Sequence, residues 1–293
     1  MKKISIILLI IVSLSCPAFA AEPASPPKRI ISLAPSTTEI LFALGLGDRI
    51  VGVTTFCDHP AEAKAKPKIG GMSNPSLEAI VNLKPDLVAM TMDGNPREVE
   101  ERLRSMKIDT YVFTARTLAE LPQGISEMGA AVGVREQAET LAREIDTALK
   151  GQRESGIGRK KKNRELRTPN AELNKTKVLF IVWPEPLIVA GPGTAIGDAI
   201  DLLGLENTAS RTKTTYPRYS IEEVIRQAPD VLFIGKGSGM DMRTVSKGIL
   251  KKLSSIPAVK NGAVCYVGDS LYRLGPRVVQ GIEELAECVS PSR

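Results

Sequence analysis

Two glutamates stand at the same position of a thirteen-residue stretch that occurs twice in the chain. Glu78 is the third residue of segment 76–88, SLEAIVNLKPDLV, and Glu222 is the third residue of segment 220–232, SIEEVIRQAPDVL. A carboxylate in the first turn of a helix interacts favourably with the helix dipole, but the dipole does not require glutamate at that position. The recurrence of both glutamates therefore indicates a function that helix stability alone does not explain.

Each copy of this stretch predicts the same local structure. Its serine caps a short helix, its Pro-Asp pair ends that helix, and the apolar run that follows is typical of a buried strand. An internal repeat of this length, 144 residues apart, indicates two related halves.

A second group of candidate residues lies in loops that follow predicted strands. Ligands of parallel α/β sheets bind outside the carboxyl ends of the strands, and aromatic side chains there offer flat apolar surface. Only 4% of the residues are aromatic, so their presence in these loops is informative, although each could simply pack over a helix end. The candidate segments are Thr54–Phe56, Gly70–Met72, Thr91–Asp93, Trp183, Tyr216 and Ser270–Arg273.

The sequence lacks the residue patterns of common catalytic and metal centres. His59, the one histidine, follows Cys57 in a predicted turn, where neighbours rarely form a nucleophile pair. Segment 235–239 does not have the spacing of a Gly-x-Ser-x-Gly elbow, and no glycine-rich phosphate loop is present. One histidine is too few for an imidazole zinc site, although His59 could be an axial ligand to a metal inside a chelate. We therefore expect neither an enzyme nor a metal site.

The first twenty residues have the pattern of a secretory signal peptide. Two lysines and an apolar run at 4–14 precede an Ala-x-Ala cleavage site that ends at Ala20. A transmembrane helix needs roughly twenty apolar residues, and no later segment of the sequence could span a membrane. Cleavage near Ala20 predicts a periplasmic protein. The poor lipobox before Cys16 argues against the alternative, a lipoprotein anchor.

The positive charge of the chain is concentrated in one segment. The formal net charge is +6, and residues 151–177 alone hold nine Lys or Arg against three Glu. A nucleic-acid-binding face would spread this charge and interleave aromatic residues, so we expect no nucleic-acid partner. The composition of residues 152–177 predicts a mobile basic insert, and residues 21–28 a flexible leader.

Three cysteines lie outside the predicted signal peptide, in a compartment that permits disulfides. Cys265 lies in a predicted strand and Cys288 near the end of the last predicted helix. A helix that returns antiparallel over its strand would bring these two residues together, so we favour a Cys265–Cys288 bridge with Cys57 free. Spacing alone does not fix the connectivity.

Alternating predicted strands and helices indicate two doubly wound parallel α/β lobes. The first lobe spans residues 29–133 and the second spans residues 178–293. A long amphipathic helix at 134–151 bridges them, which places a ligand cleft between the lobes. Within the first lobe, Ser36–Glu39 has the sequence of a capping box, with Glu39 reaching back to the helix start.

Three motifs carry a family resemblance over nearly the whole chain outside the insert. Segments 29–45, 51–60 and 83–88 (RIISLAPSTTEILFALG, VGVTTFCDHP and LKPDLV) resemble periplasmic substrate-binding proteins of ABC importers for cobalamin, a group that also carries haem and ferric siderophores. The resemblance implies two lobes on one rigid helix with limited closure. It also implies that Glu78 and Glu222 form salt bridges with arginines of the permease.

The resemblance places the ligand-binding positions residue by residue. The family's ligand tyrosine corresponds to Phe56, one cleft tryptophan corresponds to Met72, and another corresponds to Tyr216. The second-lobe ligand loop, Asp-Trp-Phe-Glu-Arg in the family, corresponds to Asp269–Arg273 and keeps only its two ends. With Thr91 and Trp183 from the loop analysis, the predicted ligand-binding set is Phe56, Met72, Thr91, Trp183, Tyr216, Asp269, Ser270, Leu271, Tyr272 and Arg273.

The leading hypothesis is a monomeric periplasmic receptor that captures a cobalt corrinoid and delivers it to an ABC permease dimer with its ATPase. The corrinoid is the ligand, and no resident cofactor is expected. One alternative keeps the receptor but replaces the ligand with haem or a ferric siderophore. An exported α/β enzyme and an interaction protein without a small ligand are alternatives of other classes.

Overall fold

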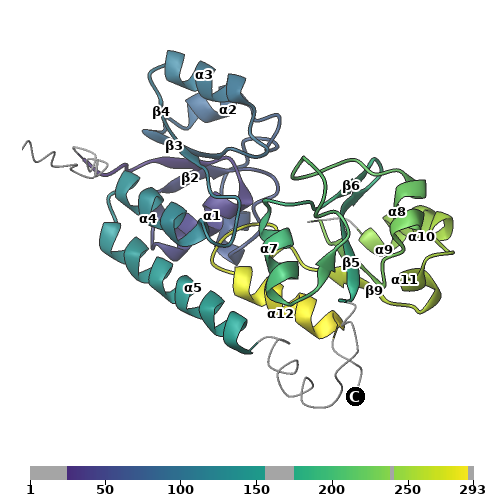
Figure 1. Cartoon of the computed structure of the whole chain (residues 1–293). Helices are drawn as coiled ribbons and strands as arrows, with labels where there is room; N and C mark the ends of the chain where they lie inside the picture. Colours follow the sequence, from purple (N-terminus) through teal and green to yellow (C-terminus); the bar gives the residue numbers. More distant parts are fainter. Residues whose placement is uncertain (1–24, 156–174, 238–240, 290–293) are drawn as a thin grey trace, which may run out of the picture.

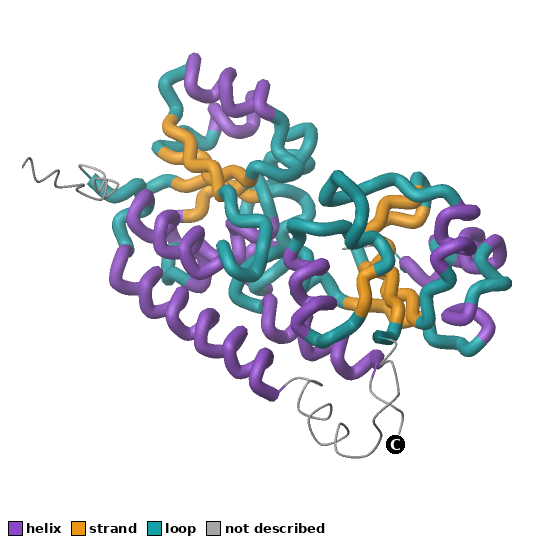
Figure 2. The backbone as a smooth tube through the Cα atoms, viewed as in Figure 1, coloured by secondary structure: helices purple, strands orange, loops and turns teal. Residues whose placement is uncertain are grey.

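The computed structural model describes residues 25–155, 175–237 and 241–289, which form two lobes built around separate β-sheets (Figure 1). The predicted signal peptide lies outside these ranges, as does most of the predicted basic insert. Figure 2 shows the two sheets at some distance from each other, with helices around them and a long helix along one side of the molecule.

The first lobe contains a four-stranded parallel sheet in the order β2-β1-β3-β4. Its central strands are short and almost wholly buried, as expected of a parallel sheet covered on both faces. The strands are β1 (Ile30–Ser32), β2 (Ile50–Val53), β3 (Leu87–Thr91) and β4 (Asp109–Phe113); the helices are α1 (Pro35–Ala43), α2 (Leu77–Asn82), α3 (Arg97–Ser105) and α4 (Leu121–Ala131), with 3₁₀ turns η1 (Gly47–Arg49) and η2 (Ala61–Ala65).

The second lobe contains a five-stranded sheet in which β6-β5-β8-β9 form the main path and β7 pairs with β5. The strands are β5 (Lys177–Pro184), β6 (Leu187–Val189), β7 (Glu206–Asn207), β8 (Val231–Gly235) and β9 (Val264–Val267). The helices are α7 (Ala195–Leu202), α8 (Ile221–Gln227), α9 (Met242–Val245), α10 (Lys247–Lys252), α11 (Pro257–Lys260) and α12 (Val278–Val289).

The second sheet is mixed, which corrects the expectation of a purely parallel sheet. Strand β6 runs antiparallel to β5, because β5 continues to Pro184 and only two residues separate it from Leu187. A connection that short can only reverse the chain. The segment 183–194, expected to be a loop, therefore begins as a β-hairpin.

Helix α5 (Arg135–Ser155) is the long helix expected at 134–151, and it continues four residues further. Its buried stripe, Ala138, Ala142, Ile145 and Leu149, packs in the main core. Beyond this stripe, Gln152 donates a hydrogen bond to Glu283 of α12, at 3.1 Å. The helix thus contacts α4 of the first lobe and the C-terminal α12. Of the predicted mobile insert, residues 152–155 belong to α5 and residues 156–174 lie outside the described ranges.

The two copies of the repeated stretch have the same structure. The hydroxyl oxygens of Ser76 and Ser220 accept hydrogen bonds from backbone N–H groups three residues later, at 3.2 and 3.1 Å, as the capping prediction requires. In each copy the Pro-Asp aspartate then accepts a backbone hydrogen bond from the start of the neighbouring strand: Asp86 from Arg29 and Asp230 from Lys177, both at 2.9 Å. Each module therefore fixes the central pair of strands in its sheet.

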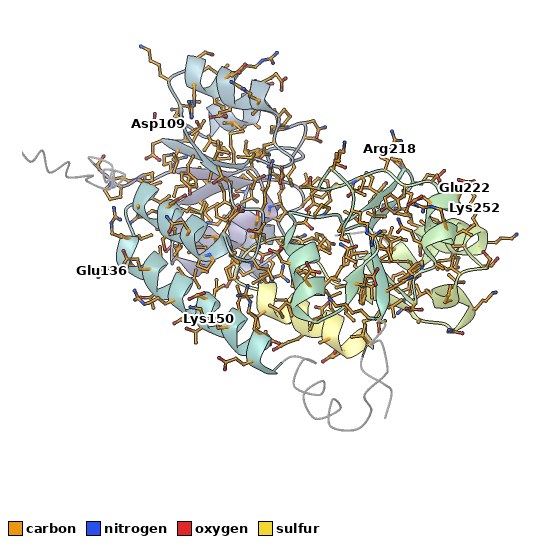
Figure 3. The ribbon with its side chains drawn as sticks, viewed as in Figure 1. Asp109, Glu136, Lys150, Arg218, Glu222 and Lys252 are labelled. Carbon is orange, nitrogen blue, oxygen red and sulfur yellow. A yellow bond between two sulfur atoms is a disulfide. The ribbon has the colours of Figure 1, made fainter. Side chains whose placement is uncertain are left out.

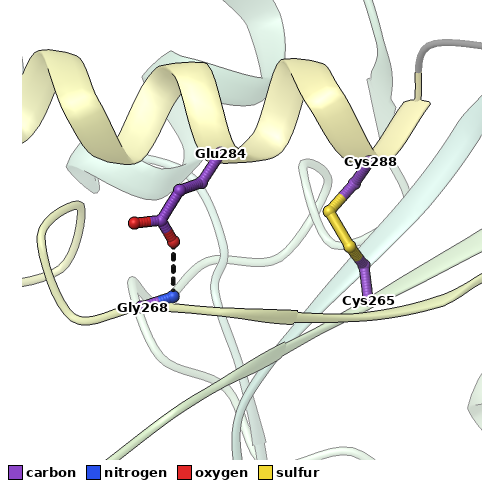
Figure 4. Close-up of a disulfide and its surroundings, with 4 residues drawn as sticks. All are labelled: Cys265, Gly268, Glu284 and Cys288. Carbon is purple, nitrogen blue, oxygen red and sulfur yellow. Dashed lines mark hydrogen bonds between the residues drawn. A yellow bond between two sulfur atoms is a disulfide. The ribbon is translucent and has the colours of Figure 1, made fainter.

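The disulfide joins Cys265 of β9 to Cys288 of α12, with Cα atoms 6.1 Å apart (Figure 4). This is the pairing expected from an antiparallel helix over its strand, and Cys57 is free and buried. In the same region, a Glu284 carboxylate oxygen accepts a hydrogen bond from the Gly268 amide at 2.6 Å. These two links hold α12 against the end of β9, from which the loop at 268–276 emerges.

The predicted capping box at Ser36–Glu39 is wrong. Helix α1 begins at Pro35, and its N-cap residue, Ala34, has no side-chain cap. The Ala34 carbonyl instead accepts hydrogen bonds from the Thr37 and Thr38 hydroxyls. Glu39 is 3% exposed and is used elsewhere, as described below.

Candidate functional site: a cleft between the lobes

A cavity of about 300 Å³ lies between the lobes and opens into a cleft of about 1040 Å³ including its solvent-facing mouth. Both lobes line it. The residues of the first lobe are Ala34, Pro35, Ser36, Phe56, Met72, Thr91, Met92, Asp93, Phe113, Ala115 and Arg116; those of the second are Ala195, Ile196, Tyr216, Gly237, Tyr272, Arg273 and Leu274.

Most of these residues follow the carboxyl end of a strand, as expected for ligand sites of parallel sheets. Thr91 and Phe113 end β3 and β4, Phe56 follows β2 by three residues, and Gly237 follows β8 by two. A second depression of about 430 Å³ shares Met92, Ala115 and Arg116 with the cavity and extends it along α4. The whole site is therefore long and open on one side.

One asparagine holds three of the first-lobe segments together at the cleft. The Asn95 amide donates to the backbone oxygens of Leu33 and Met72, at 3.0 and 2.9 Å, and accepts from the Thr91 amide at 2.8 Å. Gly94 has a positive φ of 101°, and a Cβ there would lie 2.3 Å from the end of the Met72 side chain. This glycine allows the Met72 side chain to lie against the loop.

Six of the ten predicted ligand-binding residues line the cavity: Phe56, Met72, Thr91, Tyr216, Tyr272 and Arg273. The Tyr272 hydroxyl donates to the Lys236 carbonyl, which ties the ring to the end of β8.

Trp183 is not among the lining residues, because it belongs to β5 rather than to a loop. The pairing of β5 with β6 shifts register between Ile181 and Trp183, and the tryptophan packs in the outer core of the second lobe. Its indole N–H donates to the Glu185 carbonyl at 2.8 Å. The structure therefore places Trp183 in a hairpin away from the cleft.

The other three predicted residues, Asp269, Ser270 and Leu271, do not line the cavity; they directly precede Tyr272 and Arg273, which do. Ser270 and Leu271 are 2% and 0% exposed, and a Cβ on Gly281 of α12 would lie 2.5 Å from the Leu271 amide nitrogen. The loop is thus pressed against α12. Asp269 does not line the cavity but binds two arginines, Arg273 and Arg277.

These arginines belong to a buried cluster of charges that joins the lobes. Arg277 donates to both carboxylate oxygens of Glu39, at 2.8 and 2.6 Å. Arg273 contacts Asp58 at 2.5 Å, Asp269 at 2.9 Å and Glu39 at 3.5 Å. Glu39 and Asp58 come from the first lobe, whereas the arginines and Asp269 come from the second.

Both arginines of this cluster stay charged. Hydrogen bonds to Glu39 raise the pKa of Arg277 above its ordinary value. Burial lowers the pKa of Arg273, but the hydrogen bond to Asp58 and the charge of Asp269 outweigh it, so its pKa is also raised. The cluster is therefore a set of ion pairs and not of neutral hydrogen bonds.

A second ion pair in the cleft joins Asp93, which belongs to the predicted segment Thr91–Asp93, to Arg116, which is not among the predicted site residues. Arg116 donates to both oxygens of Asp93, at 2.6 and 2.8 Å. Tyr216 of the other lobe is 41% exposed. Partial burial raises the pKa of its hydroxyl to about 12, and the negative charge of Asp93 acts in the same direction. Asp93 and Arg116 follow the ends of β3 and β4 by two and three residues, so the strand-end rule that includes Asp93 could also have found Arg116.

Glu78 and Glu222 lie outside the cleft, exposed on α2 and α8. Figure 3 shows Glu222 at the surface of the second lobe. Hydrogen bonds from its own amide and from Ser220 lower the pKa of Glu222. Its carboxylate is therefore ionised at neutral pH.

Among the residues that the structure describes, no group of three or more His, Cys, Asp or Glu side chains could hold a metal ion, and no helix is long and apolar enough to cross a membrane.

Residues 30–271 match the family model described as periplasmic binding protein. The chain belongs to this family. Periplasmic binding proteins of this family are substrate-binding proteins of ABC transporters rather than enzymes, which confirms the non-enzymatic prediction and sets aside the exported-enzyme alternative. An ABC permease with its ATPase is accordingly the expected partner of a small-molecule receptor.

The names of relatives within the family mention different ligands. A vitamin B12-binding protein of Vibrio parahaemolyticus is 30% identical over 89% of both chains. An uncharacterized ABC transporter substrate-binding lipoprotein of Bacillus subtilis is 31% identical over 90% of this chain and 81% of its own. A periplasmic haem-binding protein of Pseudomonas aeruginosa has a TM-score of 0.79 at 25% identity, over 91% of this chain and 94% of its own. The fold is shared, and the choice between cobalamin and haem is left open.

The interlobe cluster leads to a stability prediction. Replacing Glu39 by Gln removes the buried carboxylate that binds Arg277 through both oxygens and leaves Asp269 as the remaining carboxylate partner of this guanidinium; losing one partner of a buried pair costs about 3 kcal/mol. We expect urea denaturation of Glu39→Gln to show a free energy of unfolding lower by about this amount.

The matched control is Glu78→Gln, an exposed glutamate, for which a change within about 0.5 kcal/mol is expected. Equal stability of the two variants would contradict a stabilising role for the cluster.

Proposed function

We propose that this periplasmic binding protein captures a corrinoid such as cobalamin in the interlobe cleft and delivers it to an ABC permease. The observation that supports this most directly is the lining of the cleft. Rings and aliphatic groups from both lobes form most of it, and a few polar groups lie at its edges. No resident cofactor is included in the proposal.

A large macrocycle suits a lining of this kind. Phe56 and Tyr216, from opposite lobes, are 45% and 41% exposed and can cover flat apolar surface when a ligand enters. The side chains of Thr91, Asp93 and Arg116 can form hydrogen bonds with the polar groups at a macrocycle's edge. The depression along α4 provides room beyond the 300 Å³ cavity for a ligand of that size.

The relatives support the same ligand class. Vitamin B12-binding proteins occur repeatedly among the curated relatives, at 27–30% identity and over most of the chain. At this level of identity, ligand-contacting residues can differ, as Phe56 and Met72 already do from the family pattern. The support is therefore for the class of ligand and not for one compound.

Haem is the second candidate, favoured by the haem-binding structural neighbour and by two thioethers in the cleft, Met72 and Met92. The Tyr272 hydroxyl, which could otherwise serve as a ligand to ferric iron, is hydrogen-bonded to the Lys236 carbonyl. His59 is not among the residues that line the cavity. These features make a corrinoid, which brings its own metal ligands, the better fit.

Delivery would use the two exposed glutamates. We propose that Glu78 and Glu222 form salt bridges with arginines on the two subunits of the permease. The receptor itself is proposed to be a periplasmic monomer, released by cleavage near Ala20. Lipidation at Cys16 is the alternative, and one curated relative is a lipoprotein.

Isothermal titration calorimetry with cyanocobalamin, haemin and a ferric siderophore tests the ligand. We expect saturable binding of cyanocobalamin, and binding of the other two that is at least tenfold weaker. Absence of heat with any corrinoid would refute the proposed ligand, and tight binding of haemin alone would select the second candidate.

Variants of the lining test the place of binding. Phe56→Ala and Tyr216→Ala should each weaken cyanocobalamin binding about tenfold, since each removes roughly 1–1.5 kcal/mol of aromatic contact. Trp183→Phe is the control, because Trp183 lies in the hairpin away from the cavity, and it should bind as the wild type does.

The docking residues are tested by charge reversal. Glu78→Lys with Glu222→Lys should abolish uptake of cyanocobalamin in cells, because matched positive charges then face the permease arginines. Ligand affinity and melting temperature should not change, since both glutamates are exposed and outside the cleft. Normal uptake, or lost ligand binding, would contradict this role.

A further inference from the structure

The helices of the two repeated modules expose the same sequence positions to solvent. From Leu77 to Leu83 and from Ile221 to Gln227, the sequence of half-buried, exposed and fully buried positions is identical residue by residue. In both helices only the fourth residue, Ile80 or Val224, is fully buried. Of the three exposed positions, the second is glutamate and the fifth is a branched aliphatic residue in both helices, whereas the sixth is Asn82 in one and Arg226 in the other.

Each helix exposes a large aliphatic side chain at the same position. Val81 is 43% exposed and Ile225 is 41% exposed, and each follows its glutamate, Glu78 or Glu222, by three residues. Residues three apart on a helix lie on the same face. A single exposed aliphatic residue on a surface needs no explanation. Here the same glutamate and aliphatic pair occurs twice, on two lobes.

The carboxylates of these pairs are available to a partner. Across the described ranges, neither Glu78 nor Glu222 has a salt-bridge partner, whereas Glu223, beside Glu222, is paired with Arg226 at 2.6 Å. In Figure 1, α2 and α8 lie on the side of the molecule away from α5 and α12. The helices that carry the two pairs thus lie on the same side of the molecule, and the residues of both pairs are exposed.

We propose that Val81 and Ile225 form the apolar half of the permease docking surface, each inserting beside the salt bridge made by Glu78 or Glu222. This inference rests on the proposed function, because it assumes that the glutamates dock on the permease. The partner is a two-fold symmetric pair of permease subunits, each presenting a basic group next to an apolar depression. Two equivalent patches of equal chemistry match two equivalent subunits, whereas one asymmetric partner would not need the repetition.

The two halves of each patch make different contributions. Exposed salt bridges steer association and are weakened by salt, so they add little to the lifetime of the complex. Burial of the aliphatic side chains is insensitive to screening and slows dissociation. Docking is therefore expected to combine a salt-dependent association rate with a largely salt-independent dissociation rate.

Binding of the full-length mature protein to its permease–ATPase complex in lipid nanodiscs tests this, by interferometry at low and high salt. The variant Val81→Ser with Ile225→Ser should bind roughly 10- to 100-fold more weakly, through faster dissociation and with the wild-type salt dependence. The control Met106→Ser with Val245→Ser removes two side chains of similar exposure, 49% and 45%, outside the repeated helices, and should bind as the wild type does.

The outcomes separate this inference from the proposed function. Each variant is first checked for wild-type melting temperature and cyanocobalamin affinity. If Glu78→Lys with Glu222→Lys abolishes docking while Val81→Ser with Ile225→Ser does not weaken it, the apolar half is refuted and the docking glutamates stand. An equal loss in the control pair would also refute it. If neither the charge-reversal variant nor the serine variant changes docking, the docking role of the whole surface fails.

Discussion

The arrangement of the lobes depends on a cluster of five charges between them, of which Glu39 and Arg273 are buried and Asp58, Asp269 and Arg277 are partly buried. Glu39 is 3% exposed, and both of its oxygens are bound by Arg277 of the opposite lobe. Removing a carboxylate from water costs several kcal/mol, and only well-placed partners offset that cost. A shift of the lobes that separated Glu39 from the arginines would leave it buried and unpaired. The cluster therefore selects one relative position, and Arg273, which belongs to it, also lines the cleft.

The repeated module connects the cleft with the proposed docking surface in each lobe. Helix α2 carries Glu78 and Val81 at one end of the module, and β3, which follows it, ends at Thr91 in the cleft. In the second lobe, α8 leads into β8, after which Gly237 lines the same cavity. In each lobe, one short element thus joins a residue of the proposed docking surface to the lining of the cleft.

Local sequence patterns were enough to predict the structure of the two repeated modules and many of the residues that line the cleft. The caps at Ser76 and Ser220 depend on spacing within one turn. The Cys265–Cys288 bridge depends on a helix returning over the adjacent strand. Both are short-range or topologically simple, so sequence alone could predict them. The strand-end rule likewise found Phe56 and Tyr272.

Local sequence patterns could not predict contacts between residues that lie far apart in the chain. Glu39 has the spacing of a capping box, but its partners lie 234 and 238 residues away, and no local pattern reports them. The prolines after Trp183 favour a loop at this position. In the structure β5 continues through Trp183, the strand pairing shifts register there, and the side chain packs against the core of the second lobe. The ion pair of Arg116 with Asp93 joins the loops after two different strands, and no local pattern reports such a contact.

A crystal structure of the protein with cyanocobalamin would test the central claim most directly, namely that the cleft held open by the buried cluster is the ligand site. The account predicts the corrin ring between Phe56 and Met72 of one lobe and Tyr216 and Tyr272 of the other. It also predicts that the Glu39–Arg277 ion pair remains intact. A corrin bound elsewhere on the surface, or a bound state in which the lobes separate and the ion pair is broken, would contradict it.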